Sequence, residues 1–192
     1  MNSRLPLAAL LSLALSSPGC TDPSTTAPDA LATPEPSFAA QSEAVRQGTS
    51  DQIRLDRTRV TDADLDQLDG LNDNLRRINL SQSEITDAGL ARIATMPKLV
   101  QLRLASGRMT DAGLECLGQL KELRHLHLIG MPIGDAGLKH LHSLKSLESL
   151  YLDGTKATDD GVSRLVEALP GVHLHFDGGH HPVDPKKDDH KH

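Results

Sequence analysis

Apolar and polar residues alternate in short segments that recur through the middle of the chain. An apolar-x-apolar pair occurs six times, with successive pairs 25 and then 24 residues apart. The pairs are Ile53/Leu55, Ile78/Leu80, Leu102/Leu104, Leu126/Leu128, Leu150/Leu152 and Leu174/Phe176. This alternation predicts short strands with the apolar side chains inward and the intervening side chains outward. A leucine three residues before most pairs, as in "LVQLRL" and "LESLYL", completes an L-x-x-L-x-L pattern.

A helix-start signal follows each of the first five strand segments. The signals read "VTDADL", "ITDAGL", "MTDAGL", "IGDAGL" and "ATDDGV". The threonine is a suitable N-cap, and the aspartate in the first turn complements the helix dipole. Apolar residues before the cap and five positions later predict a hydrophobic staple. One strand-turn-helix unit of this size cannot bury its own apolar face, so we expect stacked units that share a continuous leucine core.

The composition supports a repeated unit and excludes several protein classes. Leucine accounts for 32 of 192 residues, whereas only Phe38, Tyr151 and Phe176 are aromatic. The net charge of −6 gives no electrostatic footprint for nucleic acid, so no nucleic-acid partner is expected. Two cysteines, Cys20 and Cys116, cannot form a disulfide framework.

Five consecutive "TDAGL"-type units give the chain its resemblance to a known family. The chain resembles the bacterial leucine-rich-repeat family with 24-residue I-T-D-A-G-L units, similar to ribonuclease-inhibitor-like and F-box-associated arrays, over residues 50–177. The resemblance implies an α/β fold, a leucine-rich-repeat solenoid with a curved parallel sheet on the concave side and helices on the convex side. The chain departs from the family where Asn usually follows the strand, and Gly107 and Met131 cannot supply that side-chain ladder.

The N-terminal residues predict the destination of the protein. In residues 1–19, Arg4 precedes an apolar stretch of 11 residues, Leu5 to Leu15. A bilayer needs about 20 residues, so this length suits a secretory signal peptide rather than a membrane span. The small residues before Cys20 resemble a bacterial lipoprotein signal, which implies cleavage before Cys20 and a lipid on its thiol. The alternatives are ordinary secretion without lipid and an uncleaved segment.

Three further segments flank the array. Residues 20–38 are rich in Pro, Ser and Thr and show no apolar period, which predicts a disordered tether. Residues 39–49 are expected to form a short capping helix. Residues 178–192 are polar and His-rich and are expected to be a disordered tail.

The outward strand positions form the candidate partner-binding face. Its residues are Arg54, Arg77, Asn79, Arg103, His127, Tyr151, Asp153 and His175. Such a face suits a protein or an anionic ligand, although polar residues also occupy an ordinary solvated sheet face. Tyr151 and Arg103 are the strongest candidate anchors, because Tyr and Arg are enriched among binding hot spots.

Histidines near the C-terminus form a candidate transition-metal site. His173 and His175 lie two apart on one predicted strand, so they share a face. His180 and His181 would join them if the tail folds back, and imidazoles suit Zn, Ni or Cu. The alternative is a polar face with a tail that binds no metal, and no other cofactor is expected.

No catalytic motif accompanies these features. The lone thiol of Cys116 falls on the convex side, and the chain contains no nucleophile elbow, phosphate-binding loop or H-E-x-x-H motif. The sequence therefore predicts a non-catalytic, exported protein, lipid-anchored in the bacterial cell envelope, that recognises an unknown protein partner through its concave face. The alternatives are a His-rich metal-binding envelope protein and the adaptor arm of a ubiquitin-ligase-like complex. The adaptor is disfavoured because the first 50 residues leave no room for a helical F-box.

Overall fold

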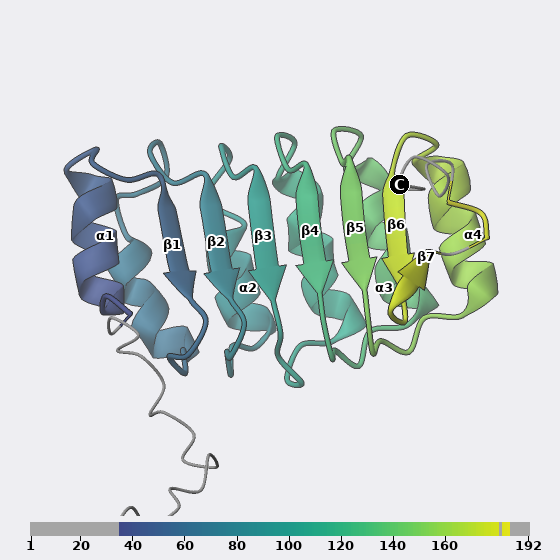
Figure 1. Cartoon of the computed structure of the whole chain (residues 1–192), viewed down its shortest axis with the longest axis horizontal. Coiled ribbons are helices and arrows are strands. Elements are labelled where there is room, and N and C mark those ends of the chain that lie inside the picture. Colours follow the sequence, from purple (N-terminus) through teal and green to yellow (C-terminus); the bar gives the residue numbers. More distant parts are fainter. Residues whose placement is uncertain (1–34, 181, 185–192) are drawn as a thin grey trace, which may run out of the picture. The chain divides into compact units, whose positions relative to one another are not determined.

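The computed structural model describes residues 35–180 and 182–184. The expected signal segment, Cys20, most of the expected tether, His181 and the end of the expected tail lie outside the described residues. Six neighbouring strands form an open parallel sheet in chain order, and a seventh strand joins its edge in the antiparallel direction (Figure 1). The strands are β1 (Gln52–Leu55), β2 (Arg77–Leu80), β3 (Gln101–Leu104), β4 (His125–Leu128), β5 (Ser149–Leu152), β6 (His173–Phe176) and β7 (Gly179–His180).

Helix α1 precedes the first strand, and the other helices connect successive strands and cover one face of the sheet (Figure 1). They are α1 (Phe38–Arg46), α2 (Asp87–Ile93), α3 (Asp135–His140), α4 (Asp159–Ala168) and the 3₁₀ helices η1 (Asp62–Leu68), η2 (Asp111–Gln119) and η3 (Leu141–Ser143). The connections through η1 and η2 consist of 3₁₀ helix, and the one through α3 ends in the 3₁₀ helix η3, so three of the five connections contain turns tighter than those of an α-helix. The predicted architecture, a leucine-rich-repeat solenoid, is confirmed. In the described part of the chain, no helix covers the other face, which we call the open sheet face.

The register of the strands follows the sequence repeat. Ile53 pairs with Ile78, and Leu102 pairs with Leu126, so equivalent positions of successive repeats lie side by side. The first apolar residue of every pair is buried, as is the second in β1 to β5. Phe176, in the last parallel strand, is only partly buried. The predicted inward alternation is therefore confirmed, and burial weakens only at the C-terminal end.

The T-D-A-G motif holds neighbouring repeats together. At the starts of η1, α2, η2 and α3, an aspartate carboxylate accepts a hydrogen bond from a backbone N–H of the next repeat, at 2.7 to 2.9 Å. The acceptor–donor pairs are Asp62–Thr86, Asp87–Thr110, Asp111–Gly134 and Asp135–Thr158. Where the donor is threonine, its hydroxyl donates to the same carboxylate. We call this set the aspartate ladder. It explains the aspartates more fully than the helix-dipole role expected from sequence.

The glycine of the motif makes room for the aspartate ladder. A Cβ added at Gly113 would collide with the Asp87 carboxylate, and one at Gly161 would collide with that of Asp135. Gly89 and Gly137 stand in the same relation to the preceding aspartates. Glycine is therefore required because of the close approach of one repeat to the next.

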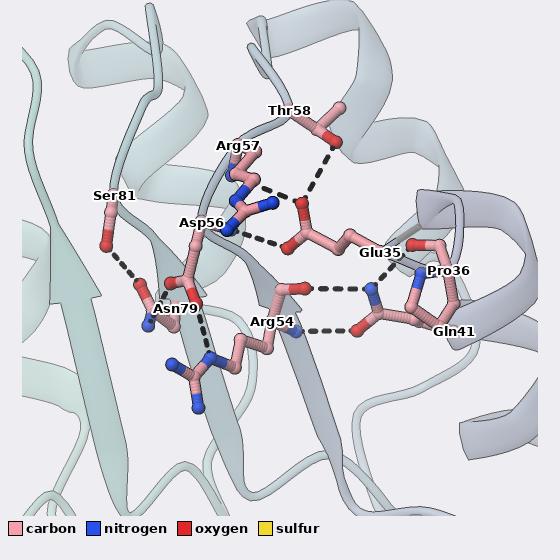
Figure 2. Close-up of polar contacts among 9 residues, drawn as sticks. All are labelled: Glu35, Pro36, Gln41, Arg54, Asp56, Arg57, Thr58, Asn79 and Ser81. Carbon is pink, nitrogen blue, oxygen red and sulfur yellow. Dashed lines mark hydrogen bonds and ion pairs between the residues drawn. The ribbon is translucent and has the colours of Figure 1, made fainter. Parts of the chain in front are cut away.

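The N-terminal edge of the sheet is covered by α1 and the residues before it (Figure 2). The Gln41 side chain donates to the carbonyl of Arg54 at 2.8 Å and accepts from its N–H at 2.7 Å. The Glu35 carboxylate accepts from the N–H groups of Asp56 at 2.6 Å and Arg57 at 3.1 Å. Helix α1 overlaps the expected capping helix at residues 39–49 and begins one residue earlier, at Phe38. Glu35, by contrast, was assigned to the disordered tether and instead contacts the array.

The C-terminal edge is paired further along the chain than expected. Strand β7 pairs with β6, with Gly179 opposite Phe176 and His180 opposite His175. The turn between them is held by the Asp153 carboxylate, which accepts from the N–H of Gly178 at 2.7 Å. The described structure thus extends past residue 177, where the sequence predicted only a disordered tail.

Candidate functional site

The open sheet face carries one outward central residue from each parallel strand. In register across β1 to β6, these residues are Arg54, Asn79, Arg103, His127, Tyr151 and His175. Arg77 lies one column away at the start of β2, and Asp153 directly follows β5. The structure therefore places the eight predicted face residues on or beside one continuous sheet, and their surroundings differ along it.

The N-terminal half of this face is neutralised internally. Arg54 forms an ion pair with Asp56, and Arg77 donates to both carboxylate oxygens of Asp51 at 2.9 and 3.0 Å. Asn79 donates to Asp56 at 2.7 Å, so its amide is also engaged (Figure 2). Two of the three arginines expected to attract an anionic partner already have carboxylates beside them.

Arg103, in the middle of the sheet, differs from these two arginines. No carboxylate forms an ion pair with it in the described part of the chain. Its Nε is buried and has no hydrogen-bond partner among residues 35–180 and 182–184. Because no carboxylate of the described chain neutralises the Arg103 guanidinium, an external acceptor would gain more there than at Arg54, which is already paired with Asp56.

The C-terminal half of the face is a row of stacked rings. The His127 and Tyr151 rings are 4.1 Å apart between centroids and 14° from parallel. Tyr151 and His175 are 4.2 Å apart and 4° from parallel. Parallel strands lie about 4.8 Å apart, so in-register rings reach stacking distance. We call His127, Tyr151 and His175 the ring row.

The His127 side chain in the ring row is uncharged at neutral pH. Burial, and then the positive charge of Arg103 on the adjacent strand, lower the pKa of His127 to about 4. His125 and His175 contribute in the same direction, whereas Asp153 opposes them. The neutral imidazole can therefore stack on Tyr151 without adding a second cation next to Arg103.

A polar chain continues from the ring row towards the C-terminus. The His173 and His175 rings are nearly perpendicular, and their Nε2 atoms are 2.9 Å apart. The Nδ1 of His173 lies 3.0 Å from a carboxylate oxygen of Asp184, whose side chain is 0% exposed. Sequence analysis missed Asp184 because no periodicity marks it and its contact depends on how the chain folds back.

The four candidate metal ligands are only partly brought together. His173 and His175 are in contact, the backbone of His180 pairs with that of His175, and His181 lies outside the described residues. Among the residues that the structure describes, no group of three or more His, Cys, Asp or Glu side chains is placed to hold a metal.

Cys116, on the helical side, has the properties of a structural thiol. Its sulfhydryl donates to the carbonyl of Gly113 at 2.9 Å, and the side chain is partly buried. Burial raises the pKa of Cys116, which keeps the thiol protonated and poorly nucleophilic at neutral pH.

Comparisons with known proteins agree with this fold. A family model described as "Leucine Rich repeat" matches residues 71–94 and 95–118. A solved internalin (inlF) from Listeria monocytogenes is 20% identical, with a TM-score of 0.57 over 71% of this chain and 37% of that chain. A leucine-rich-repeat protein from Leptospira interrogans is 21% identical, with a TM-score of 0.49 over 70% of this chain and 33% of that one. No curated protein matches.

These structural relatives extend well beyond the matched region, since the chain spans about a third of the length of each. At this level of identity the internalin likeness establishes the fold alone. In the described part of the chain, no helix is both long and apolar enough to cross a membrane.

Proposed function

We propose that the chain is a non-catalytic recognition protein that binds a protein partner through the open sheet face. The proposal rests mainly on Arg103, the arginine on this face without a carboxylate partner in the described chain. The neighbouring ring row adds flat, largely apolar surface. Arg103 and Tyr151 lie two strands apart on the same face, with His127 between them, and arginine and tyrosine are both enriched among interface hot spots.

The surroundings of Arg103 suggest the chemistry of the partner. A carboxylate of the partner would form charge-assisted hydrogen bonds with the guanidinium. An aromatic or other flat side chain would cover the ring row, since stacked rings attract further aromatic groups. The N-terminal half of the face, already neutralised, would contribute contact area more than binding energy.

A capture experiment tests the recognition surface. Immobilised parent chain, an Arg103→Ala/Tyr151→Ala variant and a Lys139→Ala/His140→Ala variant would be exposed to the same extract of surface proteins. The control variant removes one cation and one ring from α3, on the opposite face. We expect the Arg103/Tyr151 variant to lose the proteins that the parent captures and the α3 variant to retain them. Equal capture by all three would place the binding surface elsewhere.

We also propose export and lipid anchoring at Cys20, supported by the apolar stretch and small residues before this cysteine. Incorporation of radiolabelled palmitate into the parent and into Cys20→Ala tests the anchor. Label in the parent alone is the expected result, and equal labelling of both would exclude Cys20 as the attachment site. Capture by the open sheet face does not depend on this outcome.

A further inference from the structure

We propose that His173 and His175 chelate a divalent transition-metal ion through their Nε2 atoms. The site lies at the C-terminal end of the sheet, and it goes beyond partner recognition because it needs neither Arg103 nor the N-terminal repeats. Three observations carry it: the geometry of the two rings, the buried carboxylate behind one of them, and the contrast with a similar histidine pair on β4.

The two Nε2 atoms lie close enough together to bind one ion. The rings are 88° from parallel and their Nε2 atoms are 2.9 Å apart. Metal–imidazole bonds are about 2.0–2.1 Å long, so two nitrogens bound at roughly 90° to one ion would be about 2.9 Å apart. The separation therefore suits one ion with both imidazoles as adjacent ligands. A small increase in the distance between the two Nε2 atoms would widen the angle at the ion to a tetrahedral one.

Asp184 prepares His173 for this role. The Asp184 carboxylate forms an ion-pair contact with Nδ1 of His173 at 3.0 Å, so a cation bound to Nε2 on the other side of the ring would strengthen this contact. Metal-ligating histidines usually have a carboxylate or carbonyl beside their other ring nitrogen. The Asp184 side chain is 0% exposed, and a cation bound to His173 would offset the cost of burying this negative charge.

Tyr151 fixes the second ligand. Its ring stacks on His175 with the two planes 4° from parallel, and this contact restricts the orientation of the imidazole. A site assembled in advance loses less conformational entropy when it binds an ion. Both ligands are thus oriented by groups that do not themselves contact the metal.

The pair His125 and His127 on β4 has the same two-residue spacing but none of this support. In the described structure no hydrogen bond or ring contact joins these two histidines, and no buried carboxylate lies behind either. Spacing alone therefore does not make the site. The β4 pair also provides a matched internal control.

The donors indicate which ions to test. Imidazole nitrogen favours Zn²⁺, Cu²⁺ and Ni²⁺ over Mg²⁺ and Ca²⁺, which prefer oxygen ligands. Two protein ligands leave coordination positions open to water or to a further donor, which is the arrangement of an accessible rather than a closed structural site.

The test uses the full chain without an affinity tag and titrates Zn²⁺ by calorimetry. We expect His173→Gln and His175→Gln each to weaken binding at least about tenfold, and Asp184→Asn to weaken it by about 10- to 100-fold, the range for loss of a supporting carboxylate. His125→Gln should bind as the parent does. A His190→Gln/His192→Gln variant should retain the His173-dependent binding. If His173→Gln and His175→Gln bind Zn²⁺ as tightly as the parent, the proposal is wrong.

A second measurement does not rely on variants and so remains informative if one fails to fold. In the parent labelled with ¹⁵N-histidine, Zn²⁺ should shift the Nε2 resonances of His173 and His175 and leave those of His125 in place. Unchanged Nε2 resonances at saturating Zn²⁺ would also overturn the proposal and would leave the pair as a simple imidazole–imidazole hydrogen bond.

Discussion

At the scale of single residues, the T-D-A-G motif is explained by contact between repeats. The carboxylate of Asp135 accepts from both the N–H and the hydroxyl of Thr158 at 2.8 Å. These hydrogen bonds hold the pKa of Asp135 below its usual range. Glycine follows two residues after Asp87, Asp111, Asp135 and Asp159, because the aspartate of the preceding repeat occupies the space of its Cβ.

Gly113→Ala tests this account of the motif. Alanine normally stabilises a helix relative to glycine by about 0.5–1 kcal/mol. Here its methyl group would displace the Asp87 carboxylate from Thr110, so we expect a loss of about 1–3 kcal/mol in the free energy of unfolding, measured with urea. Gly107→Ala is the control, because a Cβ there meets nothing within 4 Å. Equal stability of the two variants would contradict the aspartate ladder.

His127 predicts a specific dependence of stability on pH. Its pKa is about 4 in the folded chain against an ordinary 6.5, so the unfolded chain binds the proton more readily. Protonation of the unfolded chain therefore lowers the free energy of unfolding. This effect is absent above pH 6.5, and stability falls as the pH drops from 6.5 towards 4. His127→Phe keeps a ring on Tyr151 but removes the titration. Because the ring lies on an open face, we expect the variant to lose of order 1 kcal/mol less than the parent between pH 7.5 and 4.5.

Urea unfolding of both proteins at the two pH values measures this difference. The other nine histidines are common to parent and variant, so their contributions cancel in the comparison to first order. Identical losses in the two proteins would mean that His127 is protonated as easily when folded as when unfolded.

At the scale of elements, the two edges of the sheet determine where the array ends. An uncovered edge strand presents unpaired N–H and C=O groups that invite association with other chains. On β1, the Gln41 amide takes the place of a neighbouring strand by bonding both backbone groups of Arg54 (Figure 2). On β6, the chain itself turns back as β7.

Gln41→Ala should expose the β1 edge. Two backbone groups of Arg54 would lose their partners, which we expect to cost about 1–2 kcal/mol and to speed hydrogen exchange at the Arg54 amide. The control is Gln47→Ala, whose side-chain amide bonds only the exposed Glu43 in the described structure. Exchange at Arg54 that is no faster in Gln41→Ala than in Gln47→Ala would show that the edge is covered by other groups.

At the scale of the whole molecule, the fold could be predicted because its determinants repeat. The 24-residue spacing, the inward leucines and the helix starts each occur several times, so each repeat supports the interpretation of the next. The face residues followed from the same alternation. The sequence did not predict which arginines of the face are neutralised. Their partners, Asp51 and Asp56, are identified only by the ion pairs that they form in the folded chain.

The ends were predicted less well than the middle for a physical reason. Terminal segments do not follow the repeat, because each must cover an edge rather than stack on a neighbour. Glu35 and Asp184 both make their contacts from segments with no apolar period. Their roles depend on a single tertiary contact each, which leaves no pattern in the sequence.

Stability should therefore be distributed unevenly along the array, and Tyr151 allows this to be measured. It is the only tyrosine in a chain without tryptophan, so its fluorescence reports on β5 while circular dichroism reports on the whole array. Leu174, buried in β6, has one parallel neighbour strand, whereas Leu102 in β3 has two. Each repeat interacts with its nearest neighbours. A destabilising substitution in the last repeat should therefore affect fewer repeats than one in the middle of the array.

We expect Leu102→Ala to cost about 2–5 kcal/mol and to shift both signals together, because it weakens the link between the two halves. Leu174→Ala should instead separate them, with the tyrosine signal changing at a lower urea concentration than the circular dichroism. In the parent the two transitions should coincide. Coincident transitions in Leu174→Ala, shifted as far as those of Leu102→Ala, would mean that the chain unfolds as one indivisible unit and that its terminal repeat is as firmly held as its centre.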